Sequence, residues 1–186
     1  MKYHNITKDD MLNGDGIRVV LWVAGCEHHC KGCQNPVTWN PDDGLEFDEA
    51  ALHEIYSELS KEHVKGITFS GGDPLHPQNR FPIFHIIQYV KEKFPNKDVW
   101  IYTGYTWEEV LADAEMHFVI EGADVLVDGR FNEDLLDKNY HWAGSTNQRV
   151  VDIKKSLQKG MVILHESNQE RRNTGTVQCR KDCQCS

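Results

Sequence analysis

Residues 17–24 read IRVVLWVA, a short and nearly continuous apolar run that is rich in β-branched side chains. Such a run is typical of a strand covered on both faces, as in a parallel sheet flanked by helices. Three later runs predict further strands, and each of them is followed by a short segment that contains glycine, as at the end of a strand. These runs are residues 66–69, 99–102 and 125–127.

Helical patterns alternate with these strands. Residues 48–61 carry apolar side chains at helical spacing, and Asp48 stands where it can cap the first turn. Residues 81–94 predict a second amphipathic helix, and residues 106–112 predict a short one that Thr106 can cap. This β-α-β-α-β-α-β order indicates an α/β fold with a parallel sheet and right-handed crossovers. Because four or five units are too few to close an eight-stranded barrel, we predict an open or partial barrel with parallel strands.

The composition sets limits on the class of protein. The chain has 186 residues, of which 39% are hydrophobic and 26% are charged, the balance of an ordinary globular domain. A net charge of −9 argues against a nucleic-acid partner, which would favour a basic surface. No apolar run approaches the ~20 residues that cross a bilayer, and no secretory signal is recognisable. We therefore expect a cytoplasmic protein with no membrane partner.

The pattern weakens in the last quarter of the chain. Residues 157–160 predict a turn, and residues 161–164 predict a last edge strand. From position 166 onward the sequence is polar and poor in residues that form a core. We therefore expect one domain in residues 1–165 and a flexible tail in residues 166–186.

Three of the six cysteines lie within eight residues, as Cys26, Cys30 and Cys33 in the spacing C-x3-C-x2-C. Clustered cysteines in a reducing compartment indicate metal or redox chemistry, and thiolates are the ligands that iron–sulfur clusters prefer. Three ligands would leave one iron of a four-iron cluster open, which is where a substrate binds. On spacing alone, a Cys3His zinc site with His28 or His29 remains an alternative, as do unrelated thiols in one loop. We interpret both histidines as exposed spacer residues.

Three motifs follow three successive predicted strands. The cysteines come after the first, residues 71–74 (GGDP) after the second and residues 103–105 (TGY) after the third. In open α/β sheets, ligands bind beyond the carboxyl ends of the strands, so we predict that the three motifs share one site. Each of the two later motifs is, taken alone, also what an ordinary turn looks like.

Several short segments, taken in this order and at these strand ends, carry a family resemblance. They are residues 13–18 (NGDGIR), 26–39 (CEHHCKGCQNPVTW), 71–75 (GGDPL), 100–105 (WIYTGY), 127–130 (VDGR) and 144–148 (GSTNQ). The chain up to about Leu164 resembles the radical S-adenosylmethionine activases of glycyl-radical enzymes. Within them it is most similar to the branch that acts on anaerobic ribonucleoside-triphosphate reductases. Gly32 stands where the wider superfamily usually has an aromatic residue, and this favours that branch.

The resemblance implies an enzyme, a radical S-adenosylmethionine oxidoreductase. It implies that Cys26, Cys30 and Cys33 hold three irons of one 4Fe-4S cluster, and that the amine and carboxylate of S-adenosylmethionine chelate the fourth. It implies that an electron from a reduced flavodoxin-like donor cleaves this cosubstrate, and that the resulting radical takes a hydrogen atom from a glycine. That glycine lies on the partner, the large subunit of the anaerobic ribonucleoside-triphosphate reductase.

The resemblance also implies a set of cosubstrate-binding residues. Residues 71–73 meet the methionine ammonium, although Asp73 is shorter than the Glu common elsewhere in the superfamily. Asp128 and Arg130, together with Asn147 and Gln148, are expected to shape a mouth that faces the partner. The full cosubstrate-binding set is Gly32, Cys33, Gln34, Gly71, Gly72, Asp73 and Thr103.

Other functions compete with this hypothesis. A pyruvate formate-lyase type of activase is similar in the N-terminal half but is a longer protein. A zinc-binding interaction module without catalysis, a plain electron carrier and a radical enzyme acting on a small molecule are the remaining alternatives. The tail carries Cys179, Cys183 and Cys185, which either bind zinc, relay reducing equivalents or meet a partner's ligands, or belong to a dispensable appendage.

Overall fold

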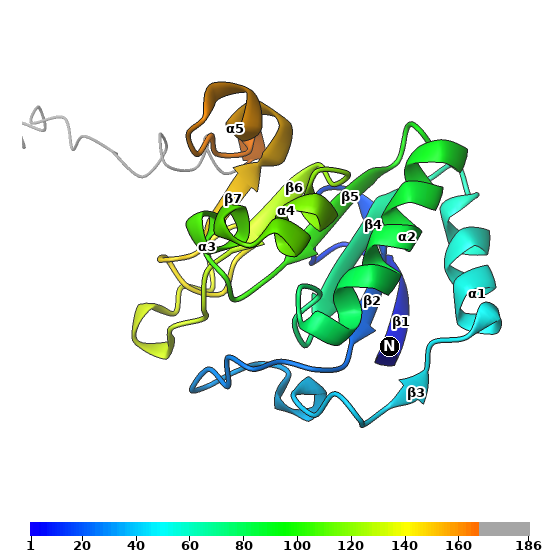
Figure 1. The fold of residues 1–186 in the computed structure, drawn as a ribbon, viewed down its shortest axis with the longest axis horizontal. Helices are drawn as coiled ribbons and strands as arrows, with labels where there is room; N and C mark the ends of the chain where they lie inside the picture. The colour runs from blue at the N-terminus through cyan, green and yellow to red at the C-terminus, as the bar shows by residue number, and fades with distance from the viewer. Residues whose placement is uncertain (168–186) are drawn as a thin grey trace, which may run out of the picture.

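The computed structural model describes residues 1–167, which form an open sheet with helices packed on it (Figure 1). The strands are β1 (Lys2–Asp10), β2 (Ile17–Val23), β3 (Leu45–Glu46), β4 (Val64–Gly71), β5 (Asp98–Tyr102), β6 (Val125–Asp128) and β7 (Arg149–Asp152). The helices are α1 (Glu49–Leu59), α2 (Pro77–Lys93), α3 (Trp107–Ala112), α4 (Ala114–Ile120) and α5 (Ile153–Lys159), with 3-10 turns η1 (Pro36–Thr38) and η2 (Glu133–Leu135).

The strand order across the sheet is β3-β1-β2-β4-β5-β6-β7. The four central strands β2, β4, β5 and β6 are parallel, as predicted, and the sheet stays open. Val23 pairs with Gly71 and Tyr102 pairs with Val127, so the carboxyl ends of the central strands lie at one edge. The prediction of parallel strands is wrong for the flanks, where β1 and β7 run antiparallel to their neighbours. Antiparallel neighbours need no crossover helix, so the alternation of strands and helices did not reveal them.

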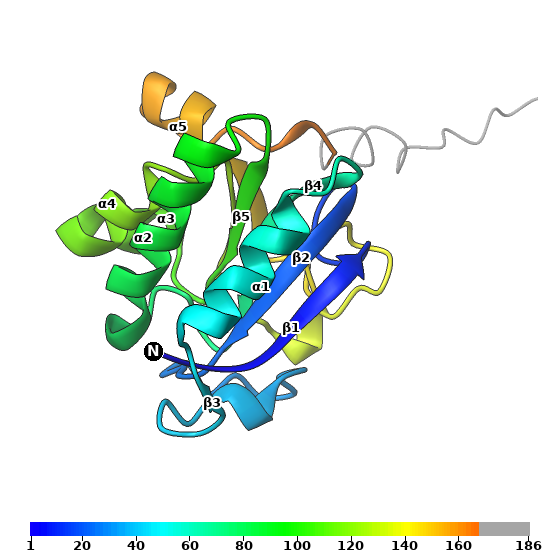
Figure 2. The ribbon, with the colours of Figure 1, turned by 90° about the vertical axis from the view of Figure 1, so that its right-hand side faces the viewer.

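The two faces of the sheet have different roles. Along a strand, successive side chains point to opposite faces. Leu21 and Phe69 belong to the main core under the helices, whereas the next residues, Trp22 and Ser70, line a cavity on the opposite face together with Tyr102. Figure 2 shows helices α2, α3 and α4 on one side of the sheet and the loop after β6 on the other. The helices thus fill one face, and the other is left for a site.

All the elements predicted between residues 17 and 127 are present, with shifted bounds. Asp48 caps α1 as predicted, because its side chain accepts a hydrogen bond from the Ala51 amide at 3.0 Å. Thr106 caps α3 in a reciprocal arrangement with the side chain of Glu109. Helix α2 begins at Pro77, four residues before the predicted start, because proline suits the first turn of a helix.

The expected turn and edge strand at residues 157–164 are wrong. The chain instead forms helix α5, which Asp152 caps and which ends at Gly160 in the left-handed conformation with φ of 63°. In place of an edge strand, the segment after α5 forms an isolated bridge between Leu164 and Val151. Helix α5 has seven residues and little apolar periodicity, so its sequence signal is weak. The polar strand β1 and the short helix α4 give equally weak signals, and neither of them was predicted from the sequence.

No helix within residues 1–167 is both long enough and apolar enough to cross a membrane. The predicted tail of residues 166–186 lies outside the described residues except for its first two positions, and the three tail cysteines lie wholly outside them.

Candidate metal and ligand site

A cavity of about 220 Å³ opens beyond the carboxyl ends of β2, β4 and β5, where the sequence placed the site. Strand residues supply its floor, and loops that follow the strands supply its walls. All three predicted motifs contribute to it, and so does the loop after β6. Its lining residues include Trp22, Cys26, His28, Cys30, Cys33, Gln34, Gly71, Gly72, Asp73, Tyr102, Thr103, Gly104, Gly129, Gly144 and Gln148.

The cysteine loop brings its three thiols to this one cavity. Cys26, Cys30 and Cys33 all line the cavity and are half-buried. The amide of Cys26 donates to the carbonyl of Trp39 at 3.0 Å, which closes the base of the loop. Within the loop, the amide of Cys33 donates to the carbonyl of Cys30 at 3.1 Å, and the amide of Asn35 donates to the Cys33 sulfur at 3.3 Å. The predicted convergence of the three cysteines is thus present in the structure.

Burial keeps the thiols of Cys26 and Cys30 protonated. It raises the pKa of Cys26 to about 11, against the opposing effect of backbone hydrogen bonds, and it also raises the pKa of Cys30. Thiols of this kind are weak nucleophiles, which argues against a catalytic cysteine. Metal binding would have to displace their protons, as it does at any thiolate site.

A zinc ion would make a different demand on these residues. It holds its ligands around one point, with sulfur about 2.3 Å from the metal. Within the described residues, no three His, Cys, Asp or Glu side chains are grouped as ligands of a single ion. In a four-iron cluster, by contrast, each thiolate binds its own iron. The arrangement therefore gives no support to the Cys3His zinc alternative, whereas three thiols around one cavity suit a cluster.

The Gly71-Gly72 segment packs directly on the base of the cysteine loop. The amide of Gly72 donates to the Val23 carbonyl at 2.8 Å. A Cβ on Gly72 would lie 2.5 Å from the Gly25 carbonyl oxygen, and one on Gly71, with φ of +98°, would lie 2.9 Å from the backbone of Val23. Each of the two Cβ positions thus faces neighbouring protein backbone. The close packing of three chain segments is what requires these glycines.

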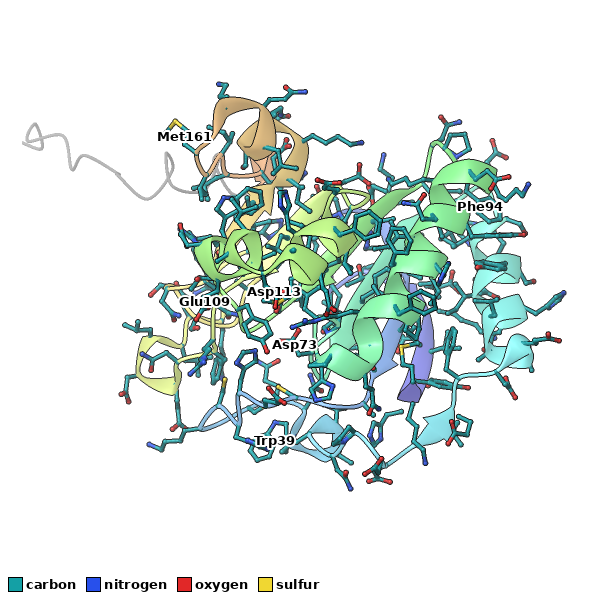
Figure 3. The ribbon with its side chains drawn as sticks, viewed as in Figure 1. Trp39, Asp73, Phe94, Glu109, Asp113 and Met161 are labelled. Carbon is teal, nitrogen blue, oxygen red and sulfur yellow. The ribbon has the colours of Figure 1, made fainter. Side chains whose placement is uncertain are left out.

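Asp73 is the centre of a buried hydrogen-bond network. Its carboxylate accepts from the Leu75 amide at 2.8 Å, the Gly104 amide at 2.9 Å and the Thr103 hydroxyl at 3.0 Å, and His28 Nε2 lies 2.7 Å away. The side chain is only 2% exposed. Asp73 and Thr103 therefore lie together in the cavity wall, as predicted, with both carboxylate oxygens engaged by protein donors. In Figure 3, Asp73 lies between the start of α2 and the loop that carries Trp39.

The other residues predicted for cosubstrate binding divide into two groups. Gln34 lines the cavity beside Cys33. Gly32, in contrast, is on the outer side of the loop, where a Cβ would lie 2.9 Å from the carboxylate of Glu133. The neighbouring Lys31 forms an ion pair with Glu133 at 3.0 Å. Gly32, with a φ of +72° that favours glycine, lies where the cysteine loop meets η2, and it is not among the residues that line the cavity.

The loops expected at the mouth of the site are anchored by Gln148. Its side-chain oxygen accepts from the amides of Gly144 and Ser145 at 3.1 and 3.2 Å, and its nitrogen donates to the Gly129 carbonyl at 2.9 Å. Asp128 does not reach this mouth, because it is 1% exposed and paired with Arg149. Arg130 and Asn147 line separate hollows outside the cavity, and Asp128 borders one of these hollows.

The interpretation of His28 as an exposed spacer is wrong. Its side chain is only 4% exposed and packs edge-on against Tyr105, with ring centres 4.5 Å apart. His29, the other histidine, is indeed exposed. The cavity also has aromatic walls from Trp22 and Tyr102, where burial raises the pKa of the tyrosine and keeps its hydroxyl neutral. Period-two alternation along β2 and β5 is the signal that could have placed both aromatic residues there.

Comparison with known protein families identifies the structural class to which the chain belongs. The chain matches the family model described as a 4Fe-4S single cluster domain over residues 12–151, a span that contains the whole cavity. The match places the open sheet and its three-thiol cavity in the class of single-cluster iron–sulfur domains.

Similar full-length proteins narrow the class. The chain is 43% identical over 150 residues to the anaerobic ribonucleoside-triphosphate reductase-activating protein of Enterobacteria phage T4, covering 81% of this chain and 93% of that protein. The protein of the same name from Escherichia coli K12 is 43% identical over 156 residues, 83% of this chain and all of that protein. The one from Pasteurella multocida is 41% identical over 152 residues, 81% and 96% of the two chains. The chain belongs to the family of anaerobic ribonucleoside-triphosphate reductase-activating proteins, as the sequence motifs predicted.

Proposed function

We propose that this chain is an activase that holds one 4Fe-4S cluster on Cys26, Cys30 and Cys33 and binds S-adenosylmethionine beside it. The observation that carries the proposal is the convergence of these three thiols with residues 71–73 and Thr103 on a single cavity. The family match supports the cluster, and the cavity offers room for a ligand next to it. Residues 1–165 would form the activase domain, with the partial barrel typical of radical S-adenosylmethionine enzymes.

The bound cluster would supply one electron for the reductive cleavage of S-adenosylmethionine to methionine and a 5′-deoxyadenosyl radical, which then takes a hydrogen atom from a glycine of the partner. The protein's part is to bind and orient. The three cysteines would give up their protons on binding iron. Gly71 and Gly72 would offer backbone carbonyls to the methionine ammonium, and Gln34 would contact the cosubstrate.

The partner that we propose is the large subunit of the anaerobic ribonucleoside-triphosphate reductase, because the relatives are named as its activating proteins. The electron donor that we propose is a reduced flavodoxin-like protein. We also propose that the protein works in the cytoplasm, in keeping with cysteines that are free in the described residues.

The test is electron paramagnetic resonance of protein purified without air and reduced, with and without S-adenosylmethionine. We expect a cluster signal that changes when the cosubstrate is added and that disappears in Cys30→Ser. Iron and sulfide analysis of the same samples provides the matched chemical measurement. A colourless protein that contains zinc and neither iron nor sulfide would overturn the proposal and leave a structural metal module.

A further inference from the structure

His28 is the donor from the cysteine loop to the Asp73 carboxylate. A carboxylate that already accepts hydrogen bonds has no hydrogen to give, so the imidazole Nε2–H is the donor, over 2.7 Å. The other donors to Asp73 come from its own turn after β4, through Leu75, and from the end of β5, through Thr103 and Gly104. One buried carboxylate therefore joins three segments of the chain.

Gly104 and Tyr105 enclose the imidazole of His28 on two sides. A Cβ on Gly104 would lie 2.2 Å from Cδ2 of His28, so the ring rests directly on the backbone of Gly104. Tyr105 packs against the ring from another side. A buried hydrogen bond to a charged group inside such a wall is stronger than one at the surface. Its geometry fixes where residue 28 lies.

The cysteine loop has further contacts. In its middle, the ring of His29 packs edge-on against Trp39 with ring centres 4.9 Å apart, and the backbone of Phe131 hydrogen-bonds to Cys30, but neither contact reaches the Gly71-Gly72 wall. At the base, the Gly25 and Cys26 amides donate to carbonyls of η1 and the residue after it, Thr38 and Trp39. Near Cys33, the ion pair between Lys31 and Glu133 involves side chains that are 87% and 44% exposed, and such pairs contribute little. His28 stands between these ends, two residues from Cys26 and two from Cys30.

We propose that His28 is a positioning residue: its hydrogen bond to Asp73 holds the cysteine loop in register with the Gly71-Gly72 wall, so that a metal cluster on the loop faces the ligand in the cavity. This inference rests on the proposed function. It gives Asp73 a role as the anchor of the loop rather than a direct ligand contact. His28 acts through Asp73, and it touches neither metal nor cosubstrate in this role.

Three variants separate the hydrogen bond from the shape of the side chain. His28→Phe keeps a ring against Tyr105 and removes the donor. His28→Gln keeps an amide nitrogen near the position of Nε2. His29→Asn is the matched control, because it changes the neighbouring exposed histidine, and Asn tolerates the φ of 46° found there.

The measurement is iron and sulfide content after anaerobic reconstitution, followed by titration of the reduced protein with S-adenosylmethionine under electron paramagnetic resonance. We expect His28→Phe to need at least about tenfold more cosubstrate for half of the spectral change, the ratio that corresponds to one lost hydrogen bond to a charged group. His28→Gln and His29→Asn are expected to lie near the wild-type value. Loss of iron from His28→Phe together with its retention in His28→Gln would equally support the role of the hydrogen bond.

Two results would overturn the inference. One is a His28→Phe protein with wild-type iron content and a wild-type titration. The other is equal impairment of His28→Phe and His28→Gln, or of all three variants, because the hydrogen bond would then not be the cause. Failure of the proposed function would look different, since the wild-type protein itself would lack the cluster signal or would not respond to the cosubstrate.

Discussion

The guanidinium carbon of Arg18 lies 5.2 Å from the centre of the Trp100 ring, two strands away on the cavity face of the sheet. Arg18 is fully buried, and its nitrogens donate to Thr68 Oγ1 and to the carbonyls of Asp15 and Ile67. The Thr68 hydroxyl in turn donates to the carbonyl of Asn13, which lines the cavity. A buried arginine thus supports one rim of the candidate site without entering it.

Replacement of Arg18 should destabilise the protein strongly. Arg18→Met keeps much of the side-chain length but leaves Asp98, whose carboxylate lies 2.6 Å from the guanidinium, without its cation. Removal of one partner of a buried pair typically costs about 3 kcal/mol or more, and we expect a loss of about 3 kcal/mol in the free energy of unfolding. Urea unfolding measures it. The exposed Arg130→Met is the control, and an equal loss there would contradict the account.

The sequence could predict the central part of this fold because its signals are local. The runs at β2, β4, β5 and β6 are apolar, and Asp48 and Thr106 mark helix starts. Strand β1 could not be predicted in the same way, since its sequence KYHNITKDD has few apolar residues and its partly buried side chains depend on pairing with β2. Tertiary pairing overrides weak local preference in such strands.

The same division applies to the site. The spacing of Cys26, Cys30 and Cys33 indicated their convergence, because eight residues of loop cannot separate them far. The burial of His28 was not predictable, because it depends on the missing Cβ of Gly104, which is 76 positions away in the sequence. The orientation of Asp73 toward protein donors likewise depends on where β5 ends. Long-range contacts of this kind leave no periodic signal.

Gly72→Ala should destabilise the protein for a purely steric reason. The added Cβ would lie 2.5 Å from the Gly25 carbonyl oxygen and 2.9 Å from that of Thr38, and neither backbone atom can move without shifting the cysteine loop. We expect a loss of about 3 kcal/mol in the free energy of unfolding, at the upper end for overpacking. Gly160→Ala is the comparison, because a Cβ at residue 160 would meet open space. Only the left-handed φ of 63° disfavours alanine there, and we expect this to lower the free energy of unfolding by about 1 kcal/mol. Thermal melts of both variants would show whether this order holds.

Gln148→Leu should loosen the mouth of the cavity. The Gln148 side chain is buried. Its replacement removes the acceptor for the Gly144 and Ser145 amides and the donor to the Gly129 carbonyl. Unsatisfied buried groups cost about 1–3 kcal/mol each, so we expect a loss of about 3 kcal/mol. Hydrogen exchange at these amides should become faster. The exposed Gln158→Leu on α5 should leave both quantities near wild type, and slow exchange in the Gln148 variant would refute the anchoring role.

Asp124 should give the protein part of its stability at neutral pH. Burial raises the pKa of Asp124, but hydrogen bonds from Lys154 and Lys91 outweigh it, and the pKa lies below its ordinary value. A carboxyl whose pKa is lowered on folding stabilises the protein above its unfolded pKa of about 3.9, and this contribution is lost as the pH falls through the lower folded value. Asp124→Asn should therefore destabilise at pH 7, by about 2 kcal/mol.

The difference between wild type and Asp124→Asn should shrink as the pH falls below about 4, because the wild-type carboxyl then becomes neutral as well. Urea unfolding at several pH values measures this difference. Asp42→Asn, in an exposed loop, is the control and should follow the wild-type curve. A difference that stays constant from neutral to acidic pH would mean that the charge of Asp124 contributes nothing and that only its shape matters.

The two groups of cysteines should differ in their effect on metal content. Cys30→Ser removes a thiol that lines the cavity. We expect the reconstituted protein to lose most of its iron and sulfide, because a cluster held by only three protein ligands would then keep two. A variant with Cys179→Ser, Cys183→Ser and Cys185→Ser together should keep the wild-type iron content. Zinc analysis of the same samples separates a second metal site from the first. Iron lost from the triple variant and kept in Cys30→Ser would reverse the assignment and place the cluster on the last cysteines of the chain.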